Sequence, residues 1–107
     1  MKIVYTYSAR QDLKDIYEYI AFTLLVPDIT RDMISRITSD IHSLESLPER
    51  NLLYKEEPWH SKGIRFLPVK KYLVFYQINE IADTVSIVRI IYGGRDITHQ
   101  LEELDNL

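Results

Sequence analysis

The stretch Gly63–Asp96 reads GIRFLPVKKYLVFYQINEIADTVSIVRIIYGGRD. It contains three runs of β-branched, aromatic and aliphatic residues, and short polar breaks separate them. Such runs predict three consecutive strands of one antiparallel meander, over residues 64–69, 72–78 and 84–92. The polar breaks supply the turns between the strands. The chain is therefore organised around a sheet in its second half.

The first half of the chain predicts a strand followed by two helices. Residues 2–7 alternate apolar and polar, which is typical of a short strand. Ser8 and Gln11 have the spacing of a capping box, so we expect the first helix to begin there. Apolar residues then recur at helical spacing in two stripes, which Pro27 separates and Pro48 ends. The stripes consist of Leu13, Ile16, Tyr17, Ile20 and Leu24, and of Met33, Ile34, Ile37, Ile41, Leu44 and Leu47.

Together these elements predict a single α+β domain over residues 1–107. About four strands, mostly antiparallel, would pack against an N-terminal helical hairpin. Residues 49–62, which include the only tryptophan, are expected to form a loop over one edge of the sheet. Residues 96–104 are expected to form a short C-terminal helix.

The composition excludes several kinds of chemistry. The chain has no cysteine, so disulfides, thiolate metal sites and cysteine nucleophiles are ruled out. Its three histidines share no metal-ligand spacing, and neither a phosphate-binding loop nor a Ser-His-Asp pattern is present. No signal peptide is evident, and no apolar run approaches the roughly 18 residues that cross a bilayer. We expect a soluble, cytoplasmic protein with no metal or organic cofactor.

Positive charge is concentrated in the predicted sheet. The window Ser61–Arg95 holds six lysines and arginines against two acidic residues, so it carries +4 in a chain whose net charge is −3. The sequence therefore predicts a basic sheet on an otherwise acidic protein, which suits an acidic partner. The six cations are Lys62, Arg65, Lys70, Lys71, Arg89 and Arg95.

Two of these arginines lie within strands, and each has two interpretations. Strict alternation places Arg65 on one face with Leu67 and Val69, either simply solvated or in contact with a phosphate or an acidic partner. Arg89 would share its face with apolar neighbours, either as a paired structural arginine or as part of the same basic surface. Those neighbours are Val85, Ile87 and Ile91.

The exit from the last strand is the most specific short stretch. In Tyr92-Gly93-Gly94-Arg95-Asp96, two glycines permit close backbone approach and would hold Arg95 at the rim of the sheet. The alternative is an ion pair between Arg95 and Asp96 that closes the turn. Tyr72 and Tyr76 share one face of the middle strand, where a place in the core is more usual than a nucleotide-stacking platform.

These patterns resemble the RelE/ParE superfamily of bacterial toxin–antitoxin modules, over nearly the whole chain. The similarity is carried by VYTYSARQDLKDIYEYI, GIRFLPVKKYLVFYQI and VSIVRIIYGGRDI. ParE-like members typically have an Arg-x-x-x-Val segment, a Tyr-x-x-Phe-Tyr strand and a His-Gly-x-Arg-Asp close. Here these are Arg65 with Val69, Tyr72 with Phe75-Tyr76, and Tyr92 to Asp96, with Tyr92 where many relatives carry histidine.

Within the superfamily the resemblance favours the ParE-like branch, whose members poison DNA gyrase and are not nucleases. RelE-like members cut messenger RNA in the ribosome. In that case Arg65, Tyr92 and Arg95 would be the catalytic residues. However, Leu73 stands where a strand arginine is expected, and no tyrosine follows Arg95. A relative that has lost its toxicity and keeps only an antitoxin-binding or regulatory role is the third possibility.

The resemblance also implies partners. A plasmid-stabilisation module of this kind encodes a cognate antitoxin beside the toxin, with an acidic, amphipathic segment that wraps it. The toxin would reach operator DNA only through that antitoxin, and its target would be gyrase, or the ribosome and its mRNA on the alternative reading. The residues expected to bind target or antitoxin are Arg65, Lys70, Lys71, Arg89, Tyr92 and Arg95.

Overall fold

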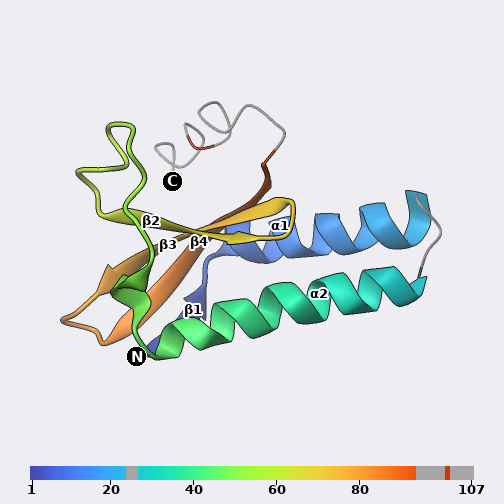
Figure 1. Ribbon diagram of the computed structural model, residues 1–107, viewed down its shortest axis with the longest axis horizontal. Coiled ribbons are helices and arrows are strands. Elements are labelled where there is room, and N and C mark those ends of the chain that lie inside the picture. The colour runs from blue at the N-terminus through green and yellow to red at the C-terminus, as the bar shows by residue number, and fades with distance from the viewer. Residues whose placement is uncertain (24–26, 94–100, 102–107) are drawn as a thin grey trace.

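Four strands form one sheet in the order β1–β4–β3–β2 (Figure 1). The computed structural model describes residues 1–23, 27–93 and 101. The meander of β2, β3 and β4 is antiparallel, and β1 joins it parallel to β4. The mostly antiparallel sheet and the positions of its last three strands are confirmed to within one residue. The strands are β1 Lys2–Tyr5, β2 Ile64–Val69, β3 Tyr72–Asn79 and β4 Thr84–Tyr92.

The two predicted helices are present and form a hairpin whose far end extends beyond the sheet (Figure 1). The first is α1, Tyr7–Glu18, which continues as a π-helical turn, η1, Tyr19–Thr23. The second is α2, Pro27–His42. Proline suits the first position of a helix because its missing N–H would have no helical partner there. Short 3₁₀ turns follow at η2, Ser43–Glu45, and η3, Pro48–Arg50.

The first helix begins earlier than the capping-box pattern predicts. Its N-cap is Thr6, not Ser8, because the strand before it ends at Tyr5. The Thr6 hydroxyl accepts a hydrogen bond from the Ala9 N–H at 3.1 Å and donates one to the Val88 carbonyl at 3.2 Å. One side chain therefore caps α1 and ties it to β4.

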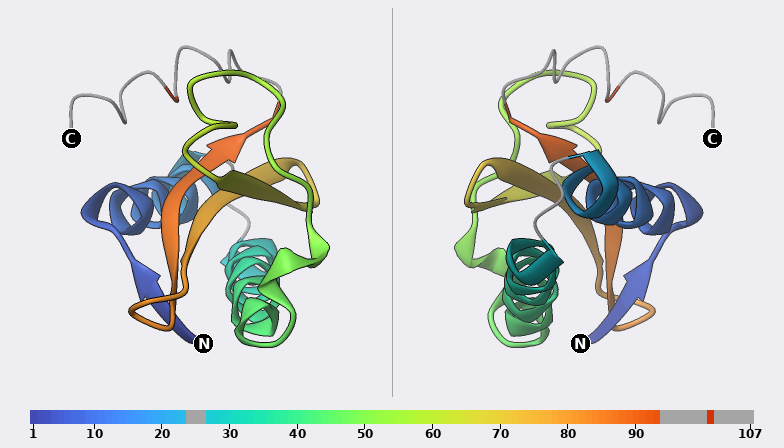
Figure 2. Two further views of the ribbon diagram at one scale, coloured as in Figure 1. Left: turned by 90° about the vertical axis from the view of Figure 1, so that its left-hand side faces the viewer. Right: turned by 90° about the vertical axis from the view of Figure 1, so that its right-hand side faces the viewer.

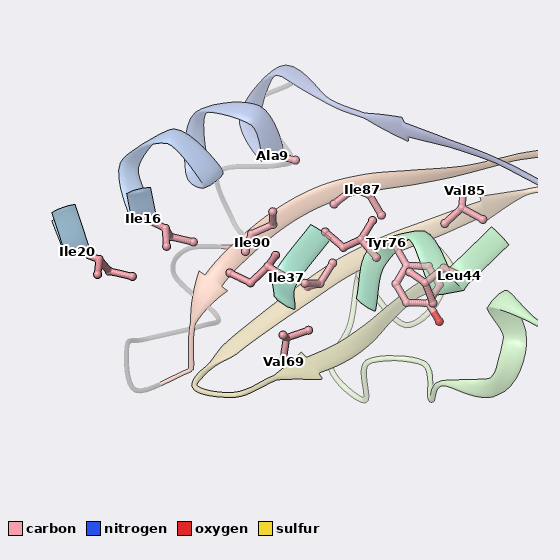
Figure 3. Packing of buried hydrophobic residues seen from close by; sticks show 12 residues of the cluster. Ala9, Ile16, Ile20, Ile37, Leu44, Val69, Tyr76, Val85, Ile87 and Ile90 are labelled. Carbon is pink, nitrogen blue, oxygen red and sulfur yellow. The ribbon is translucent and has the colours of Figure 1, made fainter. Parts of the chain in front are cut away.

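The main core lies between the helical hairpin and one face of the sheet (Figure 3). Both helical stripes contribute to it, as the spacing predicts, and Tyr76 is fully buried there. Leu47 is an exception, because it is 75% exposed and has a positive φ of 54° after the second helix has ended. Tyr17 is another, because it is 48% exposed, and Leu24 lies outside the described residues. The labelled core residues are Ala9, Ile16, Ile20, Ile37, Leu44, Val69, Tyr76, Val85, Ile87 and Ile90.

A second, smaller core lies on the opposite face of the sheet. The segment after η3 was expected at one edge, and it does pair with the outer side of β2 through a bridge between Leu53 and Arg65. It also carries Trp59 over the second face, where this side chain is 2% exposed and packs with Phe75 and Leu101. Leu101, which is helical, is the only residue of the predicted C-terminal helix that the structure describes. None of the helices in the described ranges is long and apolar enough to span a membrane.

A bulge in β4 changes which residues share a face. Arg89 lies opposite Phe75 while Ile87 lies opposite Tyr76, so Val88 is an extra residue without a partner of its own. Beyond the bulge the alternation is reversed. Ile91 therefore belongs to the second core and not to the face of Val85 and Ile87. The expectation that Arg89 shares one face with all three was wrong for this reason.

Candidate functional site

Arg65 is partly buried and is held by two backbone carbonyls. It lies on β2 opposite Tyr76, on the face that the helices cover. Its Nη1 donates to the Asn51 carbonyl at 2.6 Å and to the Glu49 carbonyl at 3.3 Å. Because a guanidinium offers five donors in a fixed geometry, it can hold a turn that exposes several carbonyls at once. In this structure Arg65 fixes the segment that follows η3.

Tyr76 holds the same segment from the other side. Its hydroxyl donates to the Pro48 carbonyl at 2.6 Å, and Figure 3 shows its oxygen directed away from the core toward that segment. Burial raises the pKa of the Tyr76 phenol, and the Asn51 side chain, followed by the charges of Arg65 and Arg50, lowers it in part. The preference for the core over a stacking platform is confirmed for Tyr76.

Arg89 forms an ion pair with Asp12 of α1. The Nε–Oδ2 distance is 2.7 Å and the Nη2–Oδ1 distance is 3.0 Å, and the Arg89 residue is 9% exposed. The pairing is the structural arrangement that was one of the two interpretations of this arginine. Arg89 is thus buried against α1, whereas Arg65 is only partly buried. The sheet does not present them as one basic surface, because Arg65 lies opposite Tyr76 and Arg89 opposite Phe75, on different faces of the sheet.

The other candidates gather at one end of the sheet, which we call the sheet rim: Lys70, Lys71, Tyr72, Tyr92 and Gly93. The two lysines form the turn between β2 and β3, and Lys70 adopts a positive φ of 56° there. Both lysine side chains are exposed. Tyr72 and Tyr92 face each other across β3 and β4 in an edge-to-face contact, with ring centroids 5.9 Å apart.

Gly93 closes the sheet rim by a backbone contact. Its N–H donates to the Lys71 carbonyl at 2.8 Å. A Cβ at this position would lie 3.3 Å from the same oxygen, so the close approach favours glycine. The close approach that the glycines predict is therefore present at Gly93. Gly94, Arg95 and Asp96 lie outside the described residues, so their predicted roles stay predictions.

The distance between Arg65 and Tyr92 limits what the two can do together. Arg65 lies opposite Tyr76, Tyr92 lies opposite Tyr72, and these two positions are four residues apart along β3. At about 3.4 Å per residue this places them about 14 Å apart along the strand direction. To reach toward Tyr92, the Arg65 side chain would also have to leave the carbonyls of Asn51 and Glu49. In this structure Arg65 and Tyr92 are therefore not brought together.

A second surface was not recognised in the sequence. Between α1 and α2, next to β1, lies an open groove. Its floor is apolar and its rim carries Arg10 and Lys14, both exposed. The sequence does contain a sign of this surface, because Arg10 and Lys14, four residues apart, flank the apolar stripe of the first helix. Tyr17 of that stripe is 48% exposed in the structure. The residues that line it are Tyr5, Arg10, Leu13, Lys14, Tyr17, Ile34 and Thr38.

A comparison with protein families found one match over most of the chain. The family model described as "ParE toxin of type II toxin-antitoxin system, parDE" matches residues 3–97. Comparison with curated proteins found no match.

Solved structures of toxin–antitoxin proteins share this fold. A chain of the chromosomal ParDE system from P. aeruginosa superposes with a TM-score of 0.70 at 20% identity, over 86% of this chain and 95% of that one. A chain of the RelBE2 complex from Mycobacterium tuberculosis gives 0.59 at 21% identity, over 85% and 88%. The YoeB/ParE toxin from Agrobacterium tumefaciens gives 0.59 at 18% identity, over 86% and 98%. At these identities the similarity is evidence for the fold alone.

Proposed function

Because the chain belongs to the family of ParE toxins of type II toxin–antitoxin systems, we propose that it acts by binding and inhibiting DNA gyrase. A cognate antitoxin would neutralise it. Several of the structural neighbours are themselves components of toxin–antitoxin complexes, which supports a protein partner of that kind. The identification of gyrase as the target rests on the ParE-like features of the sequence together with the geometry of the candidate site.

The separation of Arg65 from Tyr92 is the observation that carries the choice of a binding mechanism. Cleavage of RNA by attack of a 2′-hydroxyl needs cations and a proton-transfer group arranged around one phosphate. Here Arg65 is bonded to the carbonyls of Asn51 and Glu49, four strand positions away from Tyr92. The exposed Tyr92 of the sheet rim and the positive charge of its lysines instead suit contact with a protein partner of complementary charge.

The alternative is a RelE-like ribosome-dependent ribonuclease, and RelBE toxins are among the structural neighbours. Their likeness to this chain is at 10–21% identity, which supports a shared fold. The alternative would need its phosphate contacts to come from groups other than Arg65. A non-toxic, antitoxin-binding relative is the remaining possibility, and loss of growth arrest on expression would identify it.

Two assays on the purified full chain test the proposal. One measures supercoiling of relaxed plasmid by DNA gyrase, and the other measures cleavage of mRNA in a translating ribosome system. We expect supercoiling to fall in proportion to added protein while the mRNA stays intact. Cut mRNA with normal supercoiling would replace the proposal with the ribonuclease, and activity in neither assay would leave the non-toxic module.

The same assays test whether Arg95 belongs to the surface that binds gyrase. Arg95→Ala should weaken inhibition of gyrase without changing the unfolding midpoint, because the proposed role is contact with the target. Lys55→Ala is the matched control, since Lys55 is an exposed cation in the segment over the second face of the sheet. A variant Arg95→Ala with full potency and normal stability would remove this residue from the surface.

A further inference from the structure

A second open groove lies between α2 and the turn that joins β2 to β3, and we call it the α2 groove. Within the described part of the chain it shares no lining residue with the groove between α1 and α2. It runs along α2 from Ile29 to Ser39, which is about 15 Å of helix at 1.5 Å per residue. Lys70 of the sheet rim borders it from the turn. The α2 groove is lined by Ile29, Asp32, Met33, Ser35, Arg36, Ser39 and Lys70.

The α2 groove offers apolar area that the core leaves uncovered. Ile37 and Ile41 of the same helix are fully buried, whereas Ile29 is 56% exposed. Met33, beside it in the groove, is partly buried against the main core. A single exposed isoleucine is ordinary on a protein surface. What assigns a use to this one is Lys70, on the other side of the groove.

Lys70 adopts a left-handed backbone conformation, with a φ of 56°. This conformation is costly for a residue with a long side chain, whereas glycine, asparagine and aspartate tolerate it. The turn between β3 and β4 has a left-handed position too, and there the residue is Asp83, with a φ of 54°. The fold alone would therefore favour glycine or asparagine at position 70. A lysine held in a strained conformation indicates that its side chain is used outside the fold.

The charged groups of the α2 groove leave its border with the sheet rim positive. On α2, Arg36 is paired with Asp40 at 3.1 Å, and Asp32 contributes one negative charge. In the turn, Lys70 and Lys71 are both exposed and have no acidic neighbour in the sequence. Figure 1 shows the helical hairpin continuing past this turn, so the α2 groove extends the sheet rim onto the projecting helices.

We propose that gyrase binds in the α2 groove as well as at the sheet rim, so that the two form one contact surface. Apolar side chains of gyrase would cover Ile29 and Met33, and a carboxylate would pair with Lys70. This rests on the proposed function, in which gyrase is the target, and it adds the second helix to the surface that binds it. DNA held by gyrase fits less well, because phosphates would pair with Lys70 but would leave Ile29 and Met33 without an apolar partner.

The substitution Lys70→Asn separates contact with gyrase from stability. Asparagine tolerates the left-handed conformation and carries no charge, so the unfolding midpoint should rise by about 2 °C or more. Inhibition of supercoiling should nevertheless weaken by about threefold or more, and the difference should shrink at high salt. Asp83→Asn is the control, because it removes a charge from the other left-handed turn position and should leave inhibition unchanged. Equal potency of Lys70→Asn and wild type would overturn the proposal, and an unchanged midpoint would remove the strain on which it rests.

Two exposed isoleucines test the apolar part of the contact. Ile29→Ser removes apolar area from the α2 groove, so the concentration that gives half-maximal inhibition should rise by about fivefold or more. Ile81→Ser is the matched control, because Ile81 is fully exposed in the turn between β3 and β4, at the other end of the sheet. It should not change inhibition. Equal potency of these two variants, at normal unfolding midpoints, would contradict the proposed contact.

Direct binding to purified gyrase, measured with and without DNA, separates this inference from the proposed function. Weaker binding of Ile29→Ser in both conditions supports both. If the wild type inhibits gyrase and Ile29→Ser binds it equally well, only the inference is overturned. A defect that appears only when DNA is present would make DNA the partner in the α2 groove and would overturn it too. If the wild type neither binds nor inhibits gyrase, the proposed function fails and this inference fails with it. Figure 2 shows α2 from both ends of the molecule.

Discussion

Arg89 of β4 and Asp12 of α1 form an ion pair with two nitrogen–oxygen contacts, at 2.7 and 3.0 Å, although 77 positions separate them in the sequence. The same Asp12 Oδ2 accepts the Ile90 N–H at 2.9 Å. Strand β1 pairs with β4 only as far as Ile87, so the start of α1 replaces it along the remaining edge. The Asp12 carboxylate thus pairs with the buried Arg89 guanidinium and also accepts a backbone hydrogen bond from the edge of β4 that β1 does not cover.

The first prediction concerns the loss of this carboxylate. Asp12→Ala should lower the free energy of unfolding by about 3–5 kcal/mol, because it leaves Arg89 as a buried cation without this partner and removes the acceptor for the Ile90 N–H. Urea unfolding followed by circular dichroism measures the change. A cost below about 1 kcal/mol would show that the pair does not hold α1 to the sheet.

Two further variants control for this result. Asp12→Ala combined with Arg89→Met removes both charges of the pair, so the double variant should be more stable than Asp12→Ala alone. Lys14→Ala removes a cation from the same helix whose pair with Glu18 is exposed and 3.9 Å long. It should change stability by no more than about 1 kcal/mol.

The second prediction concerns the hydroxyl of Tyr76. Tyr76→Phe keeps the buried ring but removes the hydrogen bond to the Pro48 carbonyl, so it should cost about 1 kcal/mol at pH 7. Crystallography or NMR should then show residues 48–51 less firmly placed. An unchanged free energy of unfolding would mean that Arg65 alone fixes this segment.

The third prediction is a pH dependence from the same phenol. Burial raises the pKa of Tyr76 above its ordinary value of 10.0, so the folded state holds the proton more tightly than the unfolded state. Its contribution to stability is therefore complete below pH 10 and is lost as the pH rises above that value. Wild type should lose stability faster than Tyr76→Phe as the pH rises above 10, as measured by urea unfolding at each pH. Parallel losses in the two proteins would contradict this.

The meander could be predicted from sequence because its information is local. Each strand is an uninterrupted apolar run, and each turn, such as Lys70-Lys71, is a short polar break. The position of β1 was not predictable in this way, since its partner β4 lies about 80 residues away and pairing across that distance leaves no local pattern. The bulge at Val88 was missed for a related reason, because period-2 alternation assumes an uninterrupted ladder.

The candidate site was less predictable than the fold. Charge counting placed Arg65 and Arg89 on a basic surface, but a count of cations does not show which carbonyl or carboxylate each one will meet. Asp12 and the Asn51 carbonyl become partners only after the chain has folded. The sheet rim was easier to locate from the sequence, because Lys71 lies in the turn before β3 and Gly93 follows the end of β4. Turn residues keep their places regardless of how the core packs.

The fourth prediction tests the exposed lysines of the sheet rim. Lys70→Gln with Lys71→Gln removes two charges and keeps side chains of similar length, so the fold should be unchanged. If these lysines contact the target, inhibition of gyrase should weaken by about three- to tenfold at low salt, and the difference should shrink as ionic strength rises. Lys55→Gln is the control for a general loss of charge. Equal potency of all three proteins would exclude the lysines from the contact.

The last prediction concerns the backbone contact that closes the sheet rim. In Gly93→Ala the added Cβ would lie 3.3 Å from the Lys71 carbonyl oxygen, which the Gly93 N–H needs as its acceptor. The hairpin turn must therefore shift by a few tenths of an ångström, at a cost of about 1 kcal/mol. Because Lys71 moves with its carbonyl, inhibition should fall more than in the stability control Gly63→Ala. Gly63 has a φ of +77° but open space around it, so alanine there strains the backbone without displacing the rim. Equal potency of the two variants at matched stability would show that the position of Lys71 does not matter for inhibition.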